Sequence, residues 1–232
     1  MKLIVDDIEC SVIRSRRKTA DIVVERDGAV VMRAPEDVSE EDLREVISRK
    51  ARWIHTARAE WEALNSARTD RPFLAGSGFL YLGKTYRLKI IKSYDPQVRL
   101  TQGQFVLSEW VLNRGEAAAR KAFRDFYSRR GEAVIPDRME NLAFRIGVEP
   151  GPVTVKELGY HWASCGAGGS LNFHWKLLMA PVRVLDYVIA HELCHLRHRD
   201  HTSAFWNEVD KAMPDYRERK DWLREFGARM DF

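Results

Sequence analysis

Two histidines four residues apart, with a glutamate directly after the first, are the strongest chemical signal in this chain. The segment reads His191-Glu192-Leu193-Cys194-His195. On a helix, residues four apart lie on the same face, so the two imidazoles can bind one metal ion. Glu192, about 100° further round the helix, can then reach a water on that ion without binding the metal. This is the HExxH arrangement of metalloproteases, with two ligands and a general base, and it predicts a metal site.

The neighbouring histidines offer two candidates for the third ligand that a catalytic zinc site normally has. Six of the seven histidines lie between residues 161 and 201. His201 follows His191 by ten residues, the offset found in HExxHxxGxxH zinc proteases. His198 lies on the same helix face, but roughly 10 Å along the axis if the helix continues. A turn after His198 would bring His201 back to the pair, so we favour His201 and keep His198 as the alternative.

Four further residues are candidates for supporting roles. Tyr216 and His161 could each donate a hydrogen bond to the oxyanion of a hydrolytic reaction. A core position for Tyr216 and a polar strand position for His161 are equally compatible with the sequence. Cys194 could be a fourth metal ligand, but it points about 60° off the ligand face by helical period, and Asp186 faces away from His191. We therefore expect Cys194 to pack in the core and Asp186 to occupy an ordinary helix position.

Composition places the chain among ordinary globular proteins. It has 232 residues, of which 45% are hydrophobic and 31% charged, which argues against disorder. No run of 18 apolar residues predicts a membrane span, and acidic residues interrupt the beginning of the chain where a signal peptide would stay apolar. Three widely spaced cysteines do not suggest a disulfide scaffold. These features predict a cytoplasmic protein without a membrane partner.

The charge balance bears on anionic partners. The net charge of +4 permits contact with an anion such as a nucleic acid but does not require it. The short basic run at residues 14–18 could touch nucleic acid, but we favour a solvated strand end as its explanation. A nucleic-acid contact therefore remains unproven at this point, and the sequence says nothing about oligomeric state.

The pattern of apolar residues predicts mainly strands before residue 112. Short strands are expected over 2–34, with a turn at Asp27-Gly28. Ser39 is a plausible N-cap for a helix that runs to about residue 63. Strand character returns over 73–108.

Mainly helices are expected after residue 112, around one hairpin. A long helix should span about 114–146, with a break near Pro136. Two strands then flank a glycine-rich turn at 166–169, and a helix opening at Pro181 carries the HExxH motif. Two shorter helices are expected at about 203–211 and 215–226, and Phe205 and Trp206 should pack beneath the metal site. We place a soft domain boundary near residue 112, giving parts 1–112 and 113–232 that could pack as one body.

Several segments together resemble the YgjP-like zincin metallopeptidases, relatives of the SprT-like and Wss-type proteases. The segment of highest similarity is HELCHLRHRDHTSAFW. Similar segments follow the family's order along nearly the whole chain: RSRRKTADIVVERDGAVVMRAP, KARWIHTAR, YHWASC, LNFHWKLLMAP and AMPDYRERKDWL. The chain departs from the family where it has HWASC in place of RWGSC, and His174 where Asn is frequent.

The resemblance implies a fold and a site. The fold would be α+β, with a β-rich N-terminal part that holds one long helix and a C-terminal zincin-like unit with a β-hairpin edge and an HExxH helix. His191, His195 and His201 would bind one zinc ion, Glu192 would be the catalytic acid and base, and the hairpin strand before the active helix would border the cleft.

These observations favour a cytoplasmic zinc metallopeptidase that cleaves a peptide or protein. A zinc-bound water, activated by Glu192, would attack the carbonyl carbon. Two alternatives remain. With Arg197 and Arg199 beside the site, the same machinery could hydrolyse a nucleotide phosphoanhydride, an activity also attached to the family name. A non-enzymatic adaptor with a structural zinc is the other, but it would have no need of Glu192.

Overall fold

The computed structural model describes residues 1–17, 19–25, 27–65, 71–159 and 161–232. The chain divides into two compact units, Met1–Arg68 and Thr69–Phe232. Each unit contains a hydrophobic core of its own. Within the described residues, every helix is too short or too polar to cross a lipid bilayer.

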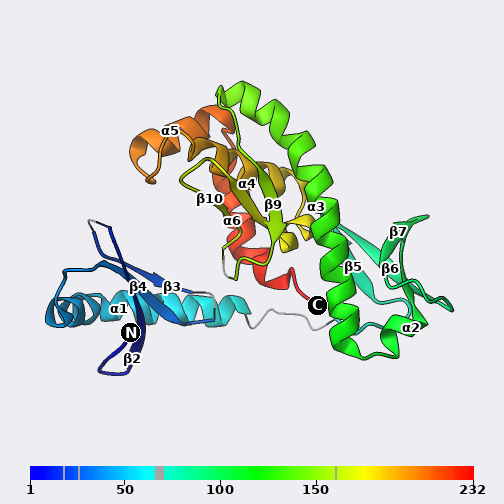
Figure 1. Cartoon of the computed structure of the whole chain (residues 1–232), viewed down its shortest axis with the longest axis horizontal. Helices are drawn as coiled ribbons and strands as arrows, with labels where there is room; N and C mark the ends of the chain where they lie inside the picture. Colours follow the sequence, from blue (N-terminus) through cyan, green and yellow to red (C-terminus); the bar gives the residue numbers. More distant parts are fainter. Residues whose placement is uncertain (18, 26, 66–70, 160) are drawn as a thin grey trace. The chain divides into compact units, whose positions relative to one another are not determined.

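The first unit is a four-stranded sheet covered by one long helix (Figure 1). The strand order is β1-β2-β4-β3, with β2 and β4 parallel and the other pairs antiparallel. Leu43, Ile47 and Ile54 are fully buried on one helix face and pack with the strand residues, as helical spacing requires. The elements are β1 (Lys2–Val5), β2 (Ile8–Ser15), β3 (Asp21–Val24), β4 (Val30–Pro35) and α1 (Glu40–Asn65).

Two local predictions for this unit are confirmed. The Ser39 hydroxyl accepts a hydrogen bond from the backbone N–H of Asp42 at 3.1 Å, which is the N-cap geometry expected at the start of α1. The chain turns between β3 and β4 at Gly28, whose φ of 84° lies in the left-handed region that glycine adopts without strain.

The second unit begins with another four-stranded sheet, in the order β5-β6-β8-β7. Its inner face forms an aromatic core with the long helix α3. The rings of Phe79 and Phe123 are stacked with centroids 4.4 Å apart, and Phe105 packs edge-on to Phe126. The elements are β5 (Gly78–Tyr81), β6 (Lys84–Ile91), β7 (Arg99–Thr101), β8 (Gln104–Ser108), α2 (Glu109–Leu112) and α3 (Glu116–Ile146).

The remainder of this unit is a small three-stranded sheet followed by helices. The sheet order is β10-β11-β9; β10 and β11 form the expected antiparallel hairpin, whereas β9 pairs in parallel with β11. Helix α3 lies between this sheet and the β5–β8 sheet (Figure 1). The elements are β9 (Val153–Lys156), β10 (Ala163–Cys165), β11 (Leu171–His174), the 3₁₀ helix η1 (Trp175–Met179), α4 (Val182–Cys194), α5 (Ser203–Ala212), α6 (Tyr216–Phe226) and the 3₁₀ helix η2 (Gly227–Arg229).

The fold is therefore the expected mixed α+β class, with a β-rich N-terminal region. The soft boundary expected near residue 112 falls inside the second unit, because strands β5–β8 share one hydrophobic core with α3 and α4. The sequence suggests grouping the strands over 73–108 with those over 2–34, because both segments have strand character. In the structure, the apolar side chains of β5–β8 instead pack against α3.

Helix α3 continues through Pro136, where a break was expected. Proline removes one hydrogen bond from a helix and crowds the preceding turn. The residues on either side, Ile135 and Met139, are buried in the core, and Pro136 itself is exposed. Packing of the buried face of α3 thus outweighs the tendency of proline to break a helix.

Gly131 allows α3 to approach the small sheet closely, and we predict that Gly131→Ala destabilises the fold. A Cβ at this position would lie 2.9 Å from Leu178 Cδ2 and 3.0 Å from Val155 Cγ1. Overpacking typically costs about 1–3 kcal/mol, more than the roughly 1 kcal/mol that alanine gains over glycine in a helix. Thermal unfolding should show a lower Tm than wild type. The matched control is Glu132→Ala, an exposed position on the same helix, and an unchanged Tm for Gly131→Ala would refute the close-packing argument.

Candidate metal centre and active site

Helix α4 separates a core face from a polar face. Val184, Leu185 and Ile189 are fully buried, whereas His191 remains partly accessible. The helix begins after Pro181, which adopts an extended conformation as its N-cap. It ends at Cys194, so the last histidine of the motif is the C-cap residue. The motif therefore straddles the end of the helix.

The early end of α4 brings the third histidine to the other two. The chain turns directly after Cys194, earlier than the turn expected after His198, and α5 starts at Ser203 with Thr202 as its cap. The backbone carbonyl of His198 accepts a hydrogen bond from His195 Nδ1 at 2.9 Å. That bond assigns the Nδ1 proton and leaves the Nε2 lone pair of His195 free, as a metal ligand requires.

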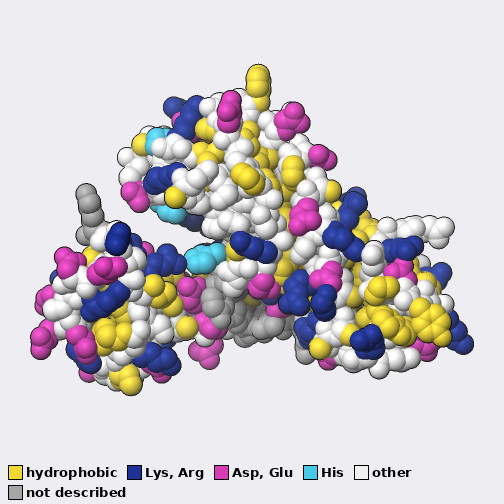
Figure 2. Space-filling view, viewed as in Figure 1, with side chains coloured by type: hydrophobic (Ala, Val, Ile, Leu, Met, Phe, Trp, Pro, Cys, Tyr) yellow, Lys and Arg dark blue, Asp and Glu magenta, His cyan; other side chains and the backbone are white. Residues whose placement is uncertain are grey.

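Three imidazole nitrogens converge at one point. The Nε2 atoms of His191, His195 and His201 are 3.0–3.2 Å apart. Among the described residues these three form the group of side chains placed to bind a metal ion. Figure 2 shows histidine side chains at the surface of this unit, and His201 is exposed, so the cluster is accessible to solvent.

The donor set fits a tetrahedral zinc ion. With Zn–N distances of about 2.0–2.1 Å, ligand nitrogens of a tetrahedral site lie about 3.3 Å apart, close to the observed separations. Burial and the neighbouring His195 and His201 lower the pKa of His191 to about 3. Burial also lowers the pKa of His201. Both rings are therefore neutral near pH 7, the form that binds a metal.

Glu192 is the buried acid beside this cluster. Its side chain is 5% exposed, and its Oε2 atom has no hydrogen-bond partner. It borders, together with His191, a cavity of about 190 Å³. Burial raises the pKa of Glu192 to about 8. A carboxyl group with a pKa near neutrality is suited to accept and return a proton.

Two aromatic rings support the imidazoles from α5, as expected. The Phe205 ring lies 4.5–4.9 Å from the rings of all three histidines. The Trp206 ring is stacked on His201 at 5.7 Å. Because these rings are held by the helix, they restrict the imidazoles to orientations that converge.

Comparison with known proteins agrees with this geometry. The family described as "YgjP-like, metallopeptidase domain" matches residues 18–226. The chain belongs to this family. It is a metallopeptidase, and the sequence resemblance is confirmed.

Among solved structures, the metallopeptidase zymogen of Pyrococcus abyssi abylysin is similar to part of this YgjP-like chain. It is 24% identical, with a TM-score of 0.39, and the similarity covers 41% of this chain and 97% of that one. No curated protein matches the chain.

The other sequence candidates lie in varied surroundings in this YgjP-like chain. Tyr216 is buried, with its ring stacked on Trp206 at 5.4 Å and on Tyr187 at 6.5 Å. His161 is exposed on the segment before β10. The cavity beside Glu192 is lined by other residues. A role of Tyr216 or His161 as oxyanion donor stays a prediction.

Tyr187 is a site residue that sequence reasoning missed. It lies one helical turn before His191, lines the cavity with Glu192, and its ring packs edge-on to His191 at 6.0 Å. Burial raises the pKa of its hydroxyl, so the group stays a hydrogen-bond donor at neutral pH. The signal was its spacing of four residues from a ligand, which places it on the ligand face.

Several polar residues near the motif have structural partners. Asp186 accepts a hydrogen bond from Arg138 at 2.7 Å, and Cys194 is fully buried, both as expected. Arg197 pairs with Glu208 at 2.8 Å. These contacts link α4 and the following turn to α3 and α5.

Arg199 has a particular role in the ligand turn. Its guanidinium donates to the carbonyls of Gly166 and Ala167 at 3.0 and 2.9 Å. It thereby ties the turn that precedes His201 to the β10–β11 hairpin. Neither Arg197 nor Arg199 is thus left as a dedicated phosphate ligand, and their contacts do not favour the nucleotide alternative.

Metal analysis can separate the two histidines considered for the third ligand. We predict that His201→Ala weakens zinc binding by at least tenfold, because it removes one of three converging nitrogens. His198→Ala should keep zinc binding close to wild type, since only its backbone carbonyl contacts the cluster. Titration with a competing chelator measures both affinities. Equal losses in the two variants would contradict the geometry.

The buried Glu192 predicts a trade-off between stability and function. Its pKa of about 8 exceeds its ordinary value of 4.5, so the metal-free folded chain holds a proton that the unfolded chain releases. The contribution of protonated Glu192 to the free energy of unfolding is fully present below pH 4.5 and is lost as the pH rises through 8. Glu192→Gln, which stays neutral, should therefore have a higher Tm than wild type in metal-free protein at pH 8 and a smaller difference at pH 5. The exposed Glu218→Gln is the control, and a lower Tm for Glu192→Gln at pH 8 would exclude this account.

Proposed function

We propose that this metallopeptidase uses one zinc ion, bound by His191, His195 and His201, and Glu192 as its general base. The observation that supports this most directly is the convergence of three Nε2 atoms within 3.2 Å. Three imidazoles on one side of an ion leave a fourth position for water or substrate, which is the pattern of catalytic rather than structural zinc.

The chemistry divides between the ion and the chain. Zinc, when bound, lowers the pKa of water and polarises a carbonyl group. Glu192 takes the proton from the attacking water and delivers it to the nitrogen of the departing amine as the C–N bond breaks. The low polarity around its carboxyl group raises the pKa of Glu192, which strengthens it as the acceptor of that proton.

The substrate in this proposal is a peptide or protein. Strand β10 lies at the edge of its sheet, and its residue Ala163 lines the cavity together with His191 and Glu192. This supports the prediction from the family resemblance that the hairpin borders the cleft. An edge strand can pair with an extended peptide through its main chain. Free cysteines at Cys10, Cys165 and Cys194 support a reducing, cytoplasmic setting for this activity.

The proposal is tested by comparing zinc-loaded wild type with zinc-loaded Glu192→Gln on a mixture of peptides. Wild type should cleave peptide bonds, and the variant should be slower by about 10²–10⁴-fold, the usual contribution of a general base. Cleavage products are identified by mass spectrometry. Zinc content must be equal in the two proteins, so that lost activity is not lost metal. Equal cleavage rates in wild type and Glu192→Gln would contradict the role of Glu192 as general base. No cleavage by wild type would contradict the peptidase proposal.

A further inference from the structure

The cavity beside the metal cluster has walls from three separate elements. It measures about 190 Å³ and is lined by Trp162 and Ala163 from the β10 side, by Leu223 from α6, and by Tyr187, Val188, His191 and Glu192 from α4. Val188 and Leu223 are themselves buried in the core. The cavity is thus bordered both by His191 and Glu192 and by apolar side chains.

The size of the cavity suits one side chain. Pockets that enclose a complete small-molecule ligand usually measure about 300–1,000 Å³, so this one is too small for a nucleotide. Four of its lining residues, Trp162, Ala163, Val188 and Leu223, present apolar side chains. No lysine or arginine is among the lining residues. A large apolar side chain gains the most from leaving water here.

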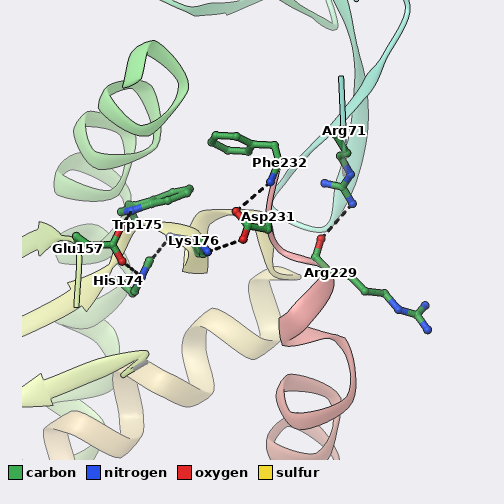
Figure 3. Close-up of polar contacts among 8 residues, drawn as sticks. All are labelled: Arg71, Glu157, His174, Trp175, Lys176, Arg229, Asp231 and Phe232. Carbon is green, nitrogen blue, oxygen red and sulfur yellow. Dashed lines mark hydrogen bonds and ion pairs between the residues drawn. The ribbon is translucent and has the colours of Figure 1, made fainter. Parts of the chain in front are cut away.

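The Trp162 wall is held in place by the strand behind it. The carbonyl of Trp162 accepts a hydrogen bond from the backbone N–H of His174 at 2.8 Å, and the two rings pack edge-on at 6.0 Å. The His174 ring is itself fixed on both sides: Nδ1 accepts from the Lys176 N–H, and Nε2 donates to Glu157 at 2.7 Å. Figure 3 shows Glu157 bridging His174 and Trp175. Trp162 is therefore a preformed wall.

We propose that this cavity binds a leucine- or phenylalanine-sized apolar side chain of the residue next to the cleaved bond, with Trp162, Ala163 and Leu223 determining specificity. The proposal rests on the peptidase function above. Its substrate class is peptides with a large apolar residue at one fixed position beside the scissile bond.

Cleavage-site profiling of the zinc-loaded enzyme tests this specificity. Wild type is incubated with a peptide library of known sequences, and the cut positions are read by mass spectrometry. Leucine and phenylalanine should be enriched over alanine by on the order of tenfold or more at one position flanking the cut, the discrimination expected of an apolar pocket. Enrichment of basic or acidic residues there, or no enrichment, would overturn the proposal.

Matched variants then connect the preference to the cavity. Ala163→Leu fills the cavity and should shift the preferred residue from leucine and phenylalanine to alanine or glycine, with zinc content unchanged. Ala117→Leu is the control, because Ala117 is an exposed residue of α3 outside the cavity, and it should keep the wild-type profile. Trp162→Ala removes one wall and should weaken the apolar preference. An unchanged profile in both Ala163→Leu and Trp162→Ala would reject the assignment.

The outcome also separates this inference from the function on which it depends. Without any cleavage by zinc-loaded wild type, the peptidase proposal fails. Cleavage that Glu192→Gln abolishes, but without an apolar preference, leaves the peptidase proposal standing and refutes the specificity pocket alone.

Discussion

Three imidazole nitrogens held about 3 Å apart are the constraint around which this unit is organised. Lone pairs that converge so closely repel one another, and protonation of any ring would add positive charge to the cluster. Burial keeps the rings of His191 and His201 neutral. Packing against Phe205 orients all three rings, and a metal ion held by them would convert the repulsion into attraction. Three features hold the nitrogens together. Helix α4 ends at Cys194, the His195–His198 hydrogen bond closes the following turn, and the Phe205 ring packs against the imidazoles.

The placement of Glu192 shows the usual conflict between stability and chemistry. Glu192 is a buried residue with one carboxylate oxygen unpartnered, and its ionisation therefore costs folding free energy. The rest of the unit offsets that cost through an extensive apolar core that includes the aromatic rings around Phe123. Groups held in unfavourable surroundings on a stable scaffold are common at active sites.

The scaffold connects distant segments to the site through a few directed contacts. Helix α3 lies between two sheets and anchors α4 through the Arg138–Asp186 pair. Arg199 ties the ligand turn to the hairpin, and His174 holds Trp162 at the cavity wall. Each contact joins a residue near the motif to a segment at least 12 positions away, so each depends on the completed fold.

The sequence by itself determined the local features of this protein. Residue spacing was enough to predict His191 and Glu192 as site residues, to separate the core face of α4 from its polar face, and to predict the Ser39 cap. These features depend on helical period and nearest neighbours. Tertiary structure decided the remainder: the parallel pairing of β9 with β11, the core shared by β5–β8 and α3, the continuity of α3 through Pro136, and the cavity between Trp162 and Leu223. These features arise where apolar surfaces from distant segments meet, and periodicity within one segment carries no information about which partner covers its exposed face.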